Sequence, residues 1–130
     1  MIVLDASTTI DWILRTPAGI QVGQRVYAHA PQVHVPHLLD LEVAQVLRRF
    51  VREGRLTPTR AEIALHDLMD ARLIRHGHAP LLPRIWQMRN NLTAYDAAYL
   101  ALAELLDAVL LTRDRKLSSA AGHHACIECI

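Results

Sequence analysis

The chain has 130 residues, 52% of them hydrophobic, and its 14 basic and 13 acidic residues give a formal charge of +1. This length predicts a single domain, residues 1–130, that can bury a real core, and the near-neutral charge favours no particular partner. No apolar run approaches the roughly 18 residues that span a bilayer, and the N-terminus lacks the basic stretch of a signal peptide, so we expect a cytoplasmic protein without membrane contact.

The basic residues are almost all of one kind. Thirteen of the 14 are Arg, and only Lys116 is Lys. The planar guanidinium group is well suited to phosphate, so this bias favours a nucleic-acid partner. A genome rich in G and C gives the same bias through its Arg codons, and that alternative stays equally open.

The chain opens on an apolar run, Ile2-Val3-Leu4, that leads directly into Asp5. Such a run predicts a strand buried on both faces of a parallel sheet. Asp5 then lies at the carboxyl end of the strand, where open α/β sheets form their ligand crevice. Two roles are open for it: a metal ligand or nucleophile, or simply the N-cap of the helix that follows.

The first half of the chain beyond this strand is mostly helical. Apolar spacing and proline or glycine breakers predict helices over residues 7–15, 20–30, 37–53 and 57–71, and a strand over residues 33–35. Glu42 lies in the first turns of the helix over 37–53, where an acid normally only matches the helix dipole. Arg48, Arg49 and Arg52 follow on the other side of that helix. Glu42 is therefore no functional signal by itself.

Residues 73–76 predict a third strand, and residues 80–90 predict a helix. His76 and His78 are separated by Gly77, which indicates a turn. No carboxylate or Cys neighbours them in sequence. We therefore expect both histidines on the surface.

The run Leu92-Thr93-Ala94-Tyr95-Asp96-Ala97 begins the most apolar helix of the chain. Thr93 and Asp96 have the spacing of a capping box, and the Ala and Leu residues behind them predict a central helix. Small residues along this helix allow close packing against its neighbours. Capping alone is a serious alternative to a functional role for Asp96.

The segment from Asp107 to Asp114 repeats the pattern of the N-terminus. An apolar strand ends in Thr112, Asp114 follows, and residues 115–120 predict a short helix before a last strand over 124–130. Two strands that each deliver a carboxylate at the carboxyl end are a stronger signal than either alone.

Cys126 and Cys129 form a C-x-x-C pair in the last predicted strand, just after His123 and His124. A structural zinc site would need a second pair of ligands, and there is no other Cys. Residues three apart in a strand point to opposite faces and lie about 10 Å apart, too far for a disulfide. We expect two free thiols, buried or half-buried.

The order of elements, β-α-α-β-α-α-β-α-α-β-α-β, predicts an α/β fold with a parallel central sheet and helices on both faces. Asp5 and Asp114 then lie at one edge of the sheet, and Glu42 and Asp96 begin helices that start at that edge. Four carboxylates at close range repel one another and therefore imply a cation. Oxygen ligands select Mg²⁺ or Mn²⁺, and such clusters support phosphodiester cleavage.

Each of the four acids lies in a short stretch that can be compared with known families: Ile2-Val3-Leu4-Asp5-Ala6-Ser7, Leu41-Glu42-Val43, Leu92-Thr93-Ala94-Tyr95-Asp96-Ala97 and Leu110-Leu111-Thr112-Arg113-Asp114-Arg115-Lys116-Leu117. With them, nearly the whole chain resembles a PIN domain, and specifically the VapC ribonuclease toxins of bacterial toxin–antitoxin pairs. The last two stretches are specific together, whereas the Asp5 and Glu42 stretches alone are weak.

The resemblance implies a Mg²⁺-dependent (or Mn²⁺-dependent) endoribonuclease that is the toxin of such a pair. It implies that Asp5, Glu42, Asp96 and Asp114 are the catalytic, metal-binding acids and that Ser7 and Thr112 support them. It also implies a cognate VapB-like antitoxin and a homodimer. The high apolar content is consistent with both, because it leaves apolar surface exposed for such contacts.

RNA is the expected substrate, and the charges are consistent with it. Without the four clustered acids, 14 basic and 9 acidic residues remain, a balance of +5. A basic surround beside a metal-filled acidic crevice suits an RNA phosphate chain, with Arg48, Arg49 and Arg52 as the expected contacts.

Other functions are less consistent with the residues. A haloacid-dehalogenase-type phosphatase would need a second Asp where Ser7 stands, and a response-regulator receiver would need adjacent acids at the end of the first strand. The alternative that stays open is a catalytically inactive PIN domain that acts as an RNA- or protein-binding module.

Overall fold

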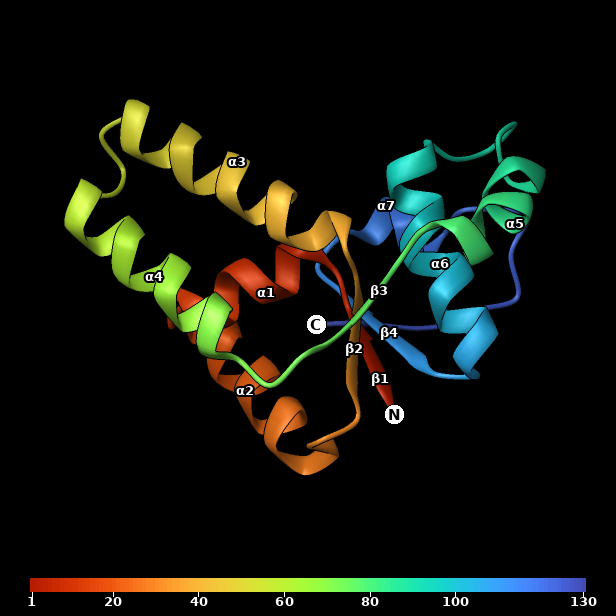
Figure 1. Cartoon of the computed structure of the whole chain (residues 1–130), viewed down its shortest axis with the longest axis horizontal. Helices are drawn as coiled ribbons and strands as arrows, with labels where there is room; N and C mark the ends of the chain where they lie inside the picture. The colour runs from red at the N-terminus through yellow and green to blue at the C-terminus, as the bar shows by residue number, and fades with distance from the viewer.

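The computed structural model describes residues 1–130 and contains one five-stranded sheet (Figure 1). The strands are β1 (Ile2–Leu4), β2 (Val33–Pro36), β3 (Ile74–His76), β4 (Val109–Thr112) and β5 (Cys126–Cys129). They are ordered β3-β2-β1-β4-β5, and all neighbours are parallel. The predicted α/β fold with a parallel sheet is confirmed, and each of the five predicted strands forms.

The helices are α1 (Ala6–Ile13), α2 (Pro17–His29), α3 (Leu38–Arg52), α4 (Pro58–Asp70), α5 (Leu82–Gln87), α6 (Ala94–Leu106) and α7 (Arg115–Ser118). Figure 1 shows α1, α2 and α4 on one side of the sheet and α5 and α6 on the other. The single helix predicted over residues 80–90 is instead a 3₁₀ turn, η1 (Ala79–Leu81), followed by the short α5. Pro80 and Pro83 lack the amide hydrogens that a continuous helix would need there.

Threonine caps three helices, and one of them starts earlier than predicted: α2 begins at Pro17 rather than at the predicted residue 20. The hydroxyl oxygens of Thr16, Thr57 and Thr93 each accept a hydrogen bond from the amide three residues later, which caps α2, α4 and α6. In α2 and α4 a proline follows the cap in the first turn, where its missing amide hydrogen costs no hydrogen bond. Just beyond the carboxyl end of α3, Gly54 has a φ of 69°, a left-handed conformation that glycine adopts without strain.

The core lies around β1 and α6. All three residues of β1 are completely buried. Each residue of α6 from Ala97 to Ala103 is at most 2% exposed. Small side chains let α6 pack closely against β1, β2 and β4. No helix has the length and apolar character that crossing a membrane would require.

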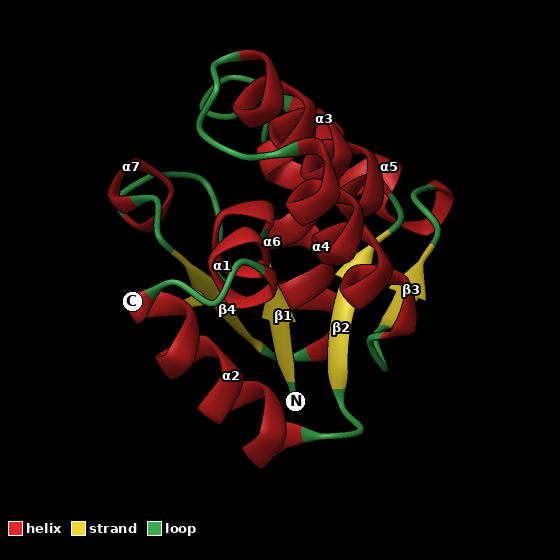
Figure 2. Ribbon diagram, turned by 90° about the vertical axis from the view of Figure 1, so that its left-hand side faces the viewer, coloured by secondary structure: helices red, strands yellow, loops and turns green.

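Helices α3 and α4 form a hairpin that runs out from the carboxyl end of β2 and returns (Figures 1 and 2). Figure 2 shows the strands behind α1, α2 and α4 in this view. The first turn of α3 therefore lies near the sheet, and its last turn lies far from it.

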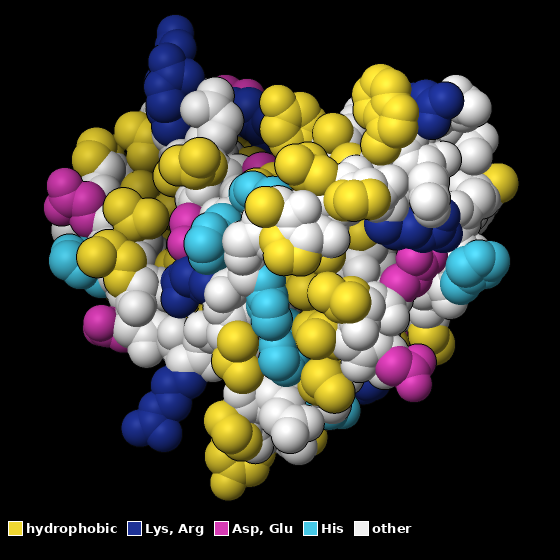
Figure 3. Space-filling model, turned by 45° about the vertical axis from the view of Figure 1, so that its right-hand side comes forward, with side chains coloured by type: hydrophobic (Ala, Val, Ile, Leu, Met, Phe, Trp, Pro, Cys, Tyr) yellow, Lys and Arg dark blue, Asp and Glu magenta, His cyan; other side chains and the backbone are white.

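His76 and His78, which were predicted to lie on the surface, are only partly exposed, and each has a specific partner. His76 Nε2 lies 2.9 Å from Nδ1 of His34, a buried residue of the adjacent strand. Burial, followed by the charge of His76, lowers the pKa of His34. His78 Nε2 accepts a hydrogen bond from the Leu38 amide and so caps α3 from another segment. Figure 3 shows His side chains in a band on one face of the molecule.

Cys126 and Cys129 are free thiols, as predicted, but the expectation that they are at least half-buried is wrong. Both are exposed. They lie at the two ends of β5, which is an edge strand with β4 as its only neighbour in the sheet. An edge strand is covered less than an interior one, and the sequence of β5 does not reveal its place in the sheet.

Candidate active site at the carboxyl edge of the sheet

The strand order reverses between β1 and β4. From β1 the chain adds β2 and β3 on one side and then crosses to β4 on the other. In open α/β sheets a ligand crevice lies outside the carboxyl ends of the strands at such a reversal. Asp5 directly follows β1, and Asp114 lies two residues beyond β4. The two carboxylates therefore stand at the point where this fold binds ligands.

Asp5 is 6% exposed, and polar groups hold both of its carboxylate oxygens. Its Oδ1 accepts hydrogen bonds from Ser7 Oγ at 2.7 Å and from the amide and hydroxyl of Thr8, both at 2.9 Å. Its Oδ2 accepts one from Thr112 Oγ1. Asp5 therefore caps α1 and also faces the end of β4, so the two roles open from sequence do not exclude each other.

Ser7 and Thr112 connect the two strand ends. Ser7 Oγ donates to Asp5 and accepts from the Arg113 amide at 3.0 Å. Thr112 Oγ1 donates to Asp5 and accepts from the Asp114 amide at 2.9 Å. Asp114 in turn accepts from the amide of Lys116 and caps α7. Both hydroxyls thus fix the position of Asp5 relative to Asp114.

Glu42 and Asp96 complete the cluster from the first turns of α3 and α6. Burial raises the pKa of Glu42, and the charges of Asp96 and Asp5 raise it further. Burial also raises the pKa of Asp96, followed by the charges of Asp114 and Asp5. Each of the four carboxylates thus lies within electrostatic range of others in the set. The charges that raise the two pKa values belong to other carboxylates, and neither Glu42 nor Asp96 forms an ion pair with a cationic side chain.

Sequence reasoning missed Tyr99, which belongs to the same cluster. Tyr99 is 2% exposed, and its Oη donates a hydrogen bond to Glu42 Oε2 at 3.3 Å. Burial, followed by the charges of Glu42 and Asp5, raises the pKa of Tyr99, so the phenol keeps its proton. The available signal was spacing, because residues three apart in a helix share a face and Asp96 and Tyr99 are three apart.

The chemistry of this cluster fits a hard divalent cation. Its donors are carboxylate oxygens with no nitrogen or sulfur ligand among them, the set that Mg²⁺ and Mn²⁺ prefer. A bound cation would offset the carboxylate charges that, after burial, raise the pKa of Glu42 and Asp96. No three His, Cys, Asp or Glu side chains lie close enough together here to hold a metal ion. The fit therefore rests on the donor chemistry.

The three expected RNA contacts lie beyond the acids on α3. At a rise of 1.5 Å per residue, Arg48 is about 9 Å and Arg52 about 15 Å from Glu42 along the axis. Arg49 is 4.0 Å from Glu53 and lies over the Phe50 ring at 5.6 Å. Arg48 and Arg52 make no ion pair with an acidic side chain and line an open hollow on α3. They are free to meet phosphate on the hairpin.

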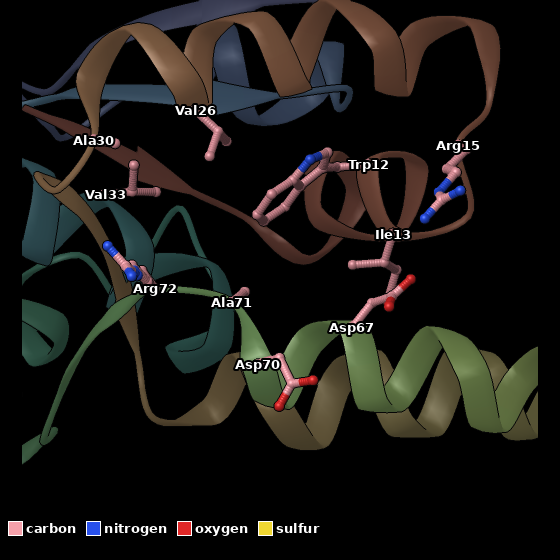
Figure 4. Close-up of a pocket in the computed structure, with 10 residues that line it drawn as sticks. All are labelled: Trp12, Ile13, Arg15, Val26, Ala30, Val33, Asp67, Asp70, Ala71 and Arg72. Atoms are coloured by element: carbon pink, nitrogen blue, oxygen red, sulfur yellow. The ribbon is translucent and has the colours of Figure 1, made fainter.

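A separate cavity of about 350 Å³ contains none of these acids (Figure 4). Trp12, Ile13 and Arg15 line it from the end of α1, and Asp67 and Asp70 from the end of α4. Its other lining residues are Val26, Ala30, Val33, Ala71 and Arg72. Val33 begins β2, so the cavity lies at the amino end of that strand, away from the acidic edge.

Fold and site together define the class of this protein, an α/β domain with four acids at the reversal of a parallel sheet. Residues 2–123 match the PIN domain family. The chain is 40% identical over 118 residues to Ribonuclease VapC9 of Mycobacterium tuberculosis, which covers 91% of this chain and 89% of that protein. The chain therefore belongs to the PIN domain family and, within it, to the VapC ribonuclease toxins.

Solved structures support the fold. PAE2754 from Pyrobaculum aerophilum superposes with a TM-score of 0.75 at 24% identity, over 97% of this chain and 81% of that one. A toxin–antitoxin complex from Klebsiella pneumoniae contains a chain that superposes with a TM-score of 0.63 at 21% identity, over 92% of this chain and 91% of that one. These likenesses agree with the five-stranded parallel sheet described above.

Proposed function

We propose that this chain is a metal-dependent endoribonuclease that hydrolyses RNA phosphodiester bonds at the acidic edge of its sheet. It acts as a single domain in the cytoplasm, as the toxin of a toxin–antitoxin pair. One observation supports this most: at the strand reversal, acids from distant segments lie close enough that other carboxylates add to burial in raising the pKa of Glu42 and Asp96.

In this proposal Asp5, Glu42, Asp96 and Asp114 hold Mg²⁺ or Mn²⁺. When bound, such a cation would supply an activated water and charge stabilisation for the leaving oxygen. Asp5 contributes a carboxylate whose direction is set by four hydrogen bonds, from Ser7, Thr8 and Thr112. Ser7 and Thr112 are supporting residues, because each of them also bonds a backbone amide at the end of β4.

The RNA chain would approach along α3. We assign Arg48, Arg49 and Arg52 to phosphate contacts beyond the cleaved bond, since phosphates follow one another along a single strand and the three arginines are spread over about 6 Å of helix axis. The balance of +5 outside the acidic cluster supports this assignment.

The proposed protein partners are a VapB-like antitoxin and a second copy of this chain. Large apolar side chains are exposed on the α3–α4 hairpin, with Leu41 at 76% and Met69 at 65%, and on α5, with Trp86 at 66%. Light scattering of the purified chain should give a dimer, and co-expression with the neighbouring small gene should give a stable complex. A monomer that binds no such partner would count against both assignments.

A metal titration on mixed RNA tests the enzymatic proposal. Cleavage that depends on Mg²⁺ or Mn²⁺ and stops with chelator is expected. RNA binding without cleavage at any metal concentration would favour the alternative, an inactive PIN domain that serves as a binding module. Asp5→Asn is the matched control for contaminating ribonucleases, because the variant should retain any cleavage that they cause.

A further inference from the structure

Tyr99 has a polar group that a residue chosen only for packing would not need. It is among the largest completely enclosed side chains of the protein and lies in the buried run of α6 between Ala97 and Ala103. A Phe would fill the same space. A buried phenol requires a hydrogen-bond partner, and the partner here is a carboxylate of the acidic cluster.

The hydrogen bond from Tyr99 joins two helices that are far apart in sequence. Tyr99 Oη on α6 donates to Glu42 Oε2 on α3 at 3.3 Å. It is the only hydrogen bond from the protein to the Glu42 side chain, whereas Asp5 accepts several. Asp5 is therefore fixed by many donors, and Glu42 is fixed by one.

Glu has three rotatable side-chain bonds, so an untethered Glu42 would occupy several rotamers. The bond to Tyr99 selects one of them and leaves the second carboxylate oxygen, Oε1, without a protein donor. Mutation of a group that orients a metal ligand typically costs about 10- to 100-fold in metal affinity or activity.

We propose that Tyr99 is a positioning residue for this site: its phenol holds Glu42 so that the second carboxylate oxygen is available to the cation. The inference rests on the proposed metal-dependent function. It assigns Tyr99 no contact with RNA or with the reacting atoms.

The test is Mn²⁺ binding by the full chain, followed by the paramagnetic resonance signal of free Mn²⁺. Tyr99→Phe removes one oxygen and keeps the ring. We expect its Kd for Mn²⁺ to rise about 10-fold. Tyr95→Phe is the matched control, because it removes the same atom from the same helix at a side chain that is 68% exposed. Its Kd should equal that of the wild type.

A double variant separates positioning from packing. In a Glu42→Gln background no carboxylate remains to be positioned, so adding Tyr99→Phe should change the Kd no further. An additional 10-fold loss in the double variant would overturn the proposal, because Tyr99 would then act through something other than Glu42.

The outcomes also distinguish this inference from the function on which it rests. A wild-type chain that binds no Mn²⁺ overturns both. A wild-type chain that binds Mn²⁺ while Tyr99→Phe binds it equally well overturns the role of Tyr99 alone. If Tyr99→Phe does not fold, Glu42→Asp changes the acceptor of the same hydrogen bond instead of its donor, by shortening the acid. This variant should weaken Mn²⁺ binding by a similar factor. Unchanged binding by Glu42→Asp would overturn the proposal.

Discussion

Glu42 and Glu104 are the same residue type, both half-buried on helices, yet the protein treats their charges in opposite ways. Glu42 has carboxylates around it and a raised pKa, caused first by burial. Glu104 accepts two hydrogen bonds from Arg84, at 2.7 and 3.0 Å, and one from the His124 amide at 2.6 Å. The hydrogen bonds from Arg84 are the largest cause of its lowered pKa. Glu42 has no cationic partner within the protein, whereas Glu104 is paired with Arg84.

The two shifts have opposite consequences for stability. Because folding raises the pKa of Glu42 and Asp96, they stabilise the fold fully only below their ordinary pKa, near 4, and this contribution is lost as pH rises through the raised values. Because folding lowers the pKa of Glu104, its contribution is present above about pH 4.3 and is lost as pH falls through the lowered value. At neutral pH the acidic edge therefore opposes folding, and the Arg84–Glu104 pair favours it.

Asp96→Asn should have the largest effect, on activity. We expect cleavage to fall roughly 100-fold or more, because the variant lacks one of the proposed metal-binding carboxylates. In chelator the variant should melt no lower than the wild type, since a repelling charge is gone and Thr93 still caps α6. Adding Mg²⁺ should stabilise it less than the wild type.

Paired melts with chelator and with Mg²⁺, beside one RNA cleavage assay, check this prediction. Asp70→Asn is the control, because Asp70 is an exposed acid on α4, outside the cluster. A variant that is destabilised in chelator but fully active would reduce Asp96 to a helix-capping residue.

Arg84→Ala should have the largest effect on stability. It leaves the Glu104 carboxylate, whose side chain is 14% exposed, without its charged partner. We expect a loss of about 2 kcal/mol, between the values for exposed and for buried pairs. Mn²⁺ affinity should not change. Denaturant titration measures the loss, with Arg49→Ala as the control, since the Arg49–Glu53 pair is largely exposed and should contribute under about 0.5 kcal/mol. Equal losses of stability in the two variants would mean that the Arg84–Glu104 pair stabilises the fold no more than the exposed Arg49–Glu53 pair does.

A pH series should separate the two regions by a smaller amount, about 1 kcal/mol or less. In chelator, the stability difference between Asp96→Asn and the wild type should shrink as pH falls through the raised pKa of Asp96. The destabilisation by Arg84→Ala should persist below pH 4, because the pKa of Glu104 is lowered. Melting curves between pH 3.5 and 7.5 measure both differences. If both differences disappear over the same pH interval, folding does not shift the pKa values of Asp96 and Glu104 in opposite directions.

Neutralising arginines on α3 should have the smallest effect per residue, on RNA affinity. Replacing Arg48, Arg49 or Arg52 by Ala should flatten the slope of log affinity against log salt by about one unit for each arginine that binds a phosphate. Filter binding of RNA by an Asp96→Asn background prevents cleavage during the measurement. Arg72→Ala, at the far end of the sheet, should leave the slope unchanged. A triple Ala variant with the wild-type slope would move the RNA path away from α3.

Local sequence was sufficient to specify the elements and most of their ends. The apolar runs that lead to Asp5 and Asp114 specify buried strands, and Thr93 with Asp96 specifies the start of α6, because both signals depend on residues within one turn or one strand. The start of α2 at Pro17 was missed, since Thr16-Pro17 predicts only a break. The carboxyl ends of parallel strands share an edge, so even the gathering of Asp5 and Asp114 followed from the order of elements.

The neighbours of each charged side chain depend on the tertiary structure. Glu42 and Glu104 look alike in sequence. Burial, followed by the charges of Asp96 and Asp5, raises the pKa of Glu42. Hydrogen bonds from Arg84, 20 residues away, lower the pKa of Glu104. The bond from Tyr99 to Glu42 and the exposure of Cys126 on an edge strand have the same origin. A local pattern reports the conformation of its own segment, whereas the free energy of a charge or a hydrogen bond depends on groups that folding brings beside it.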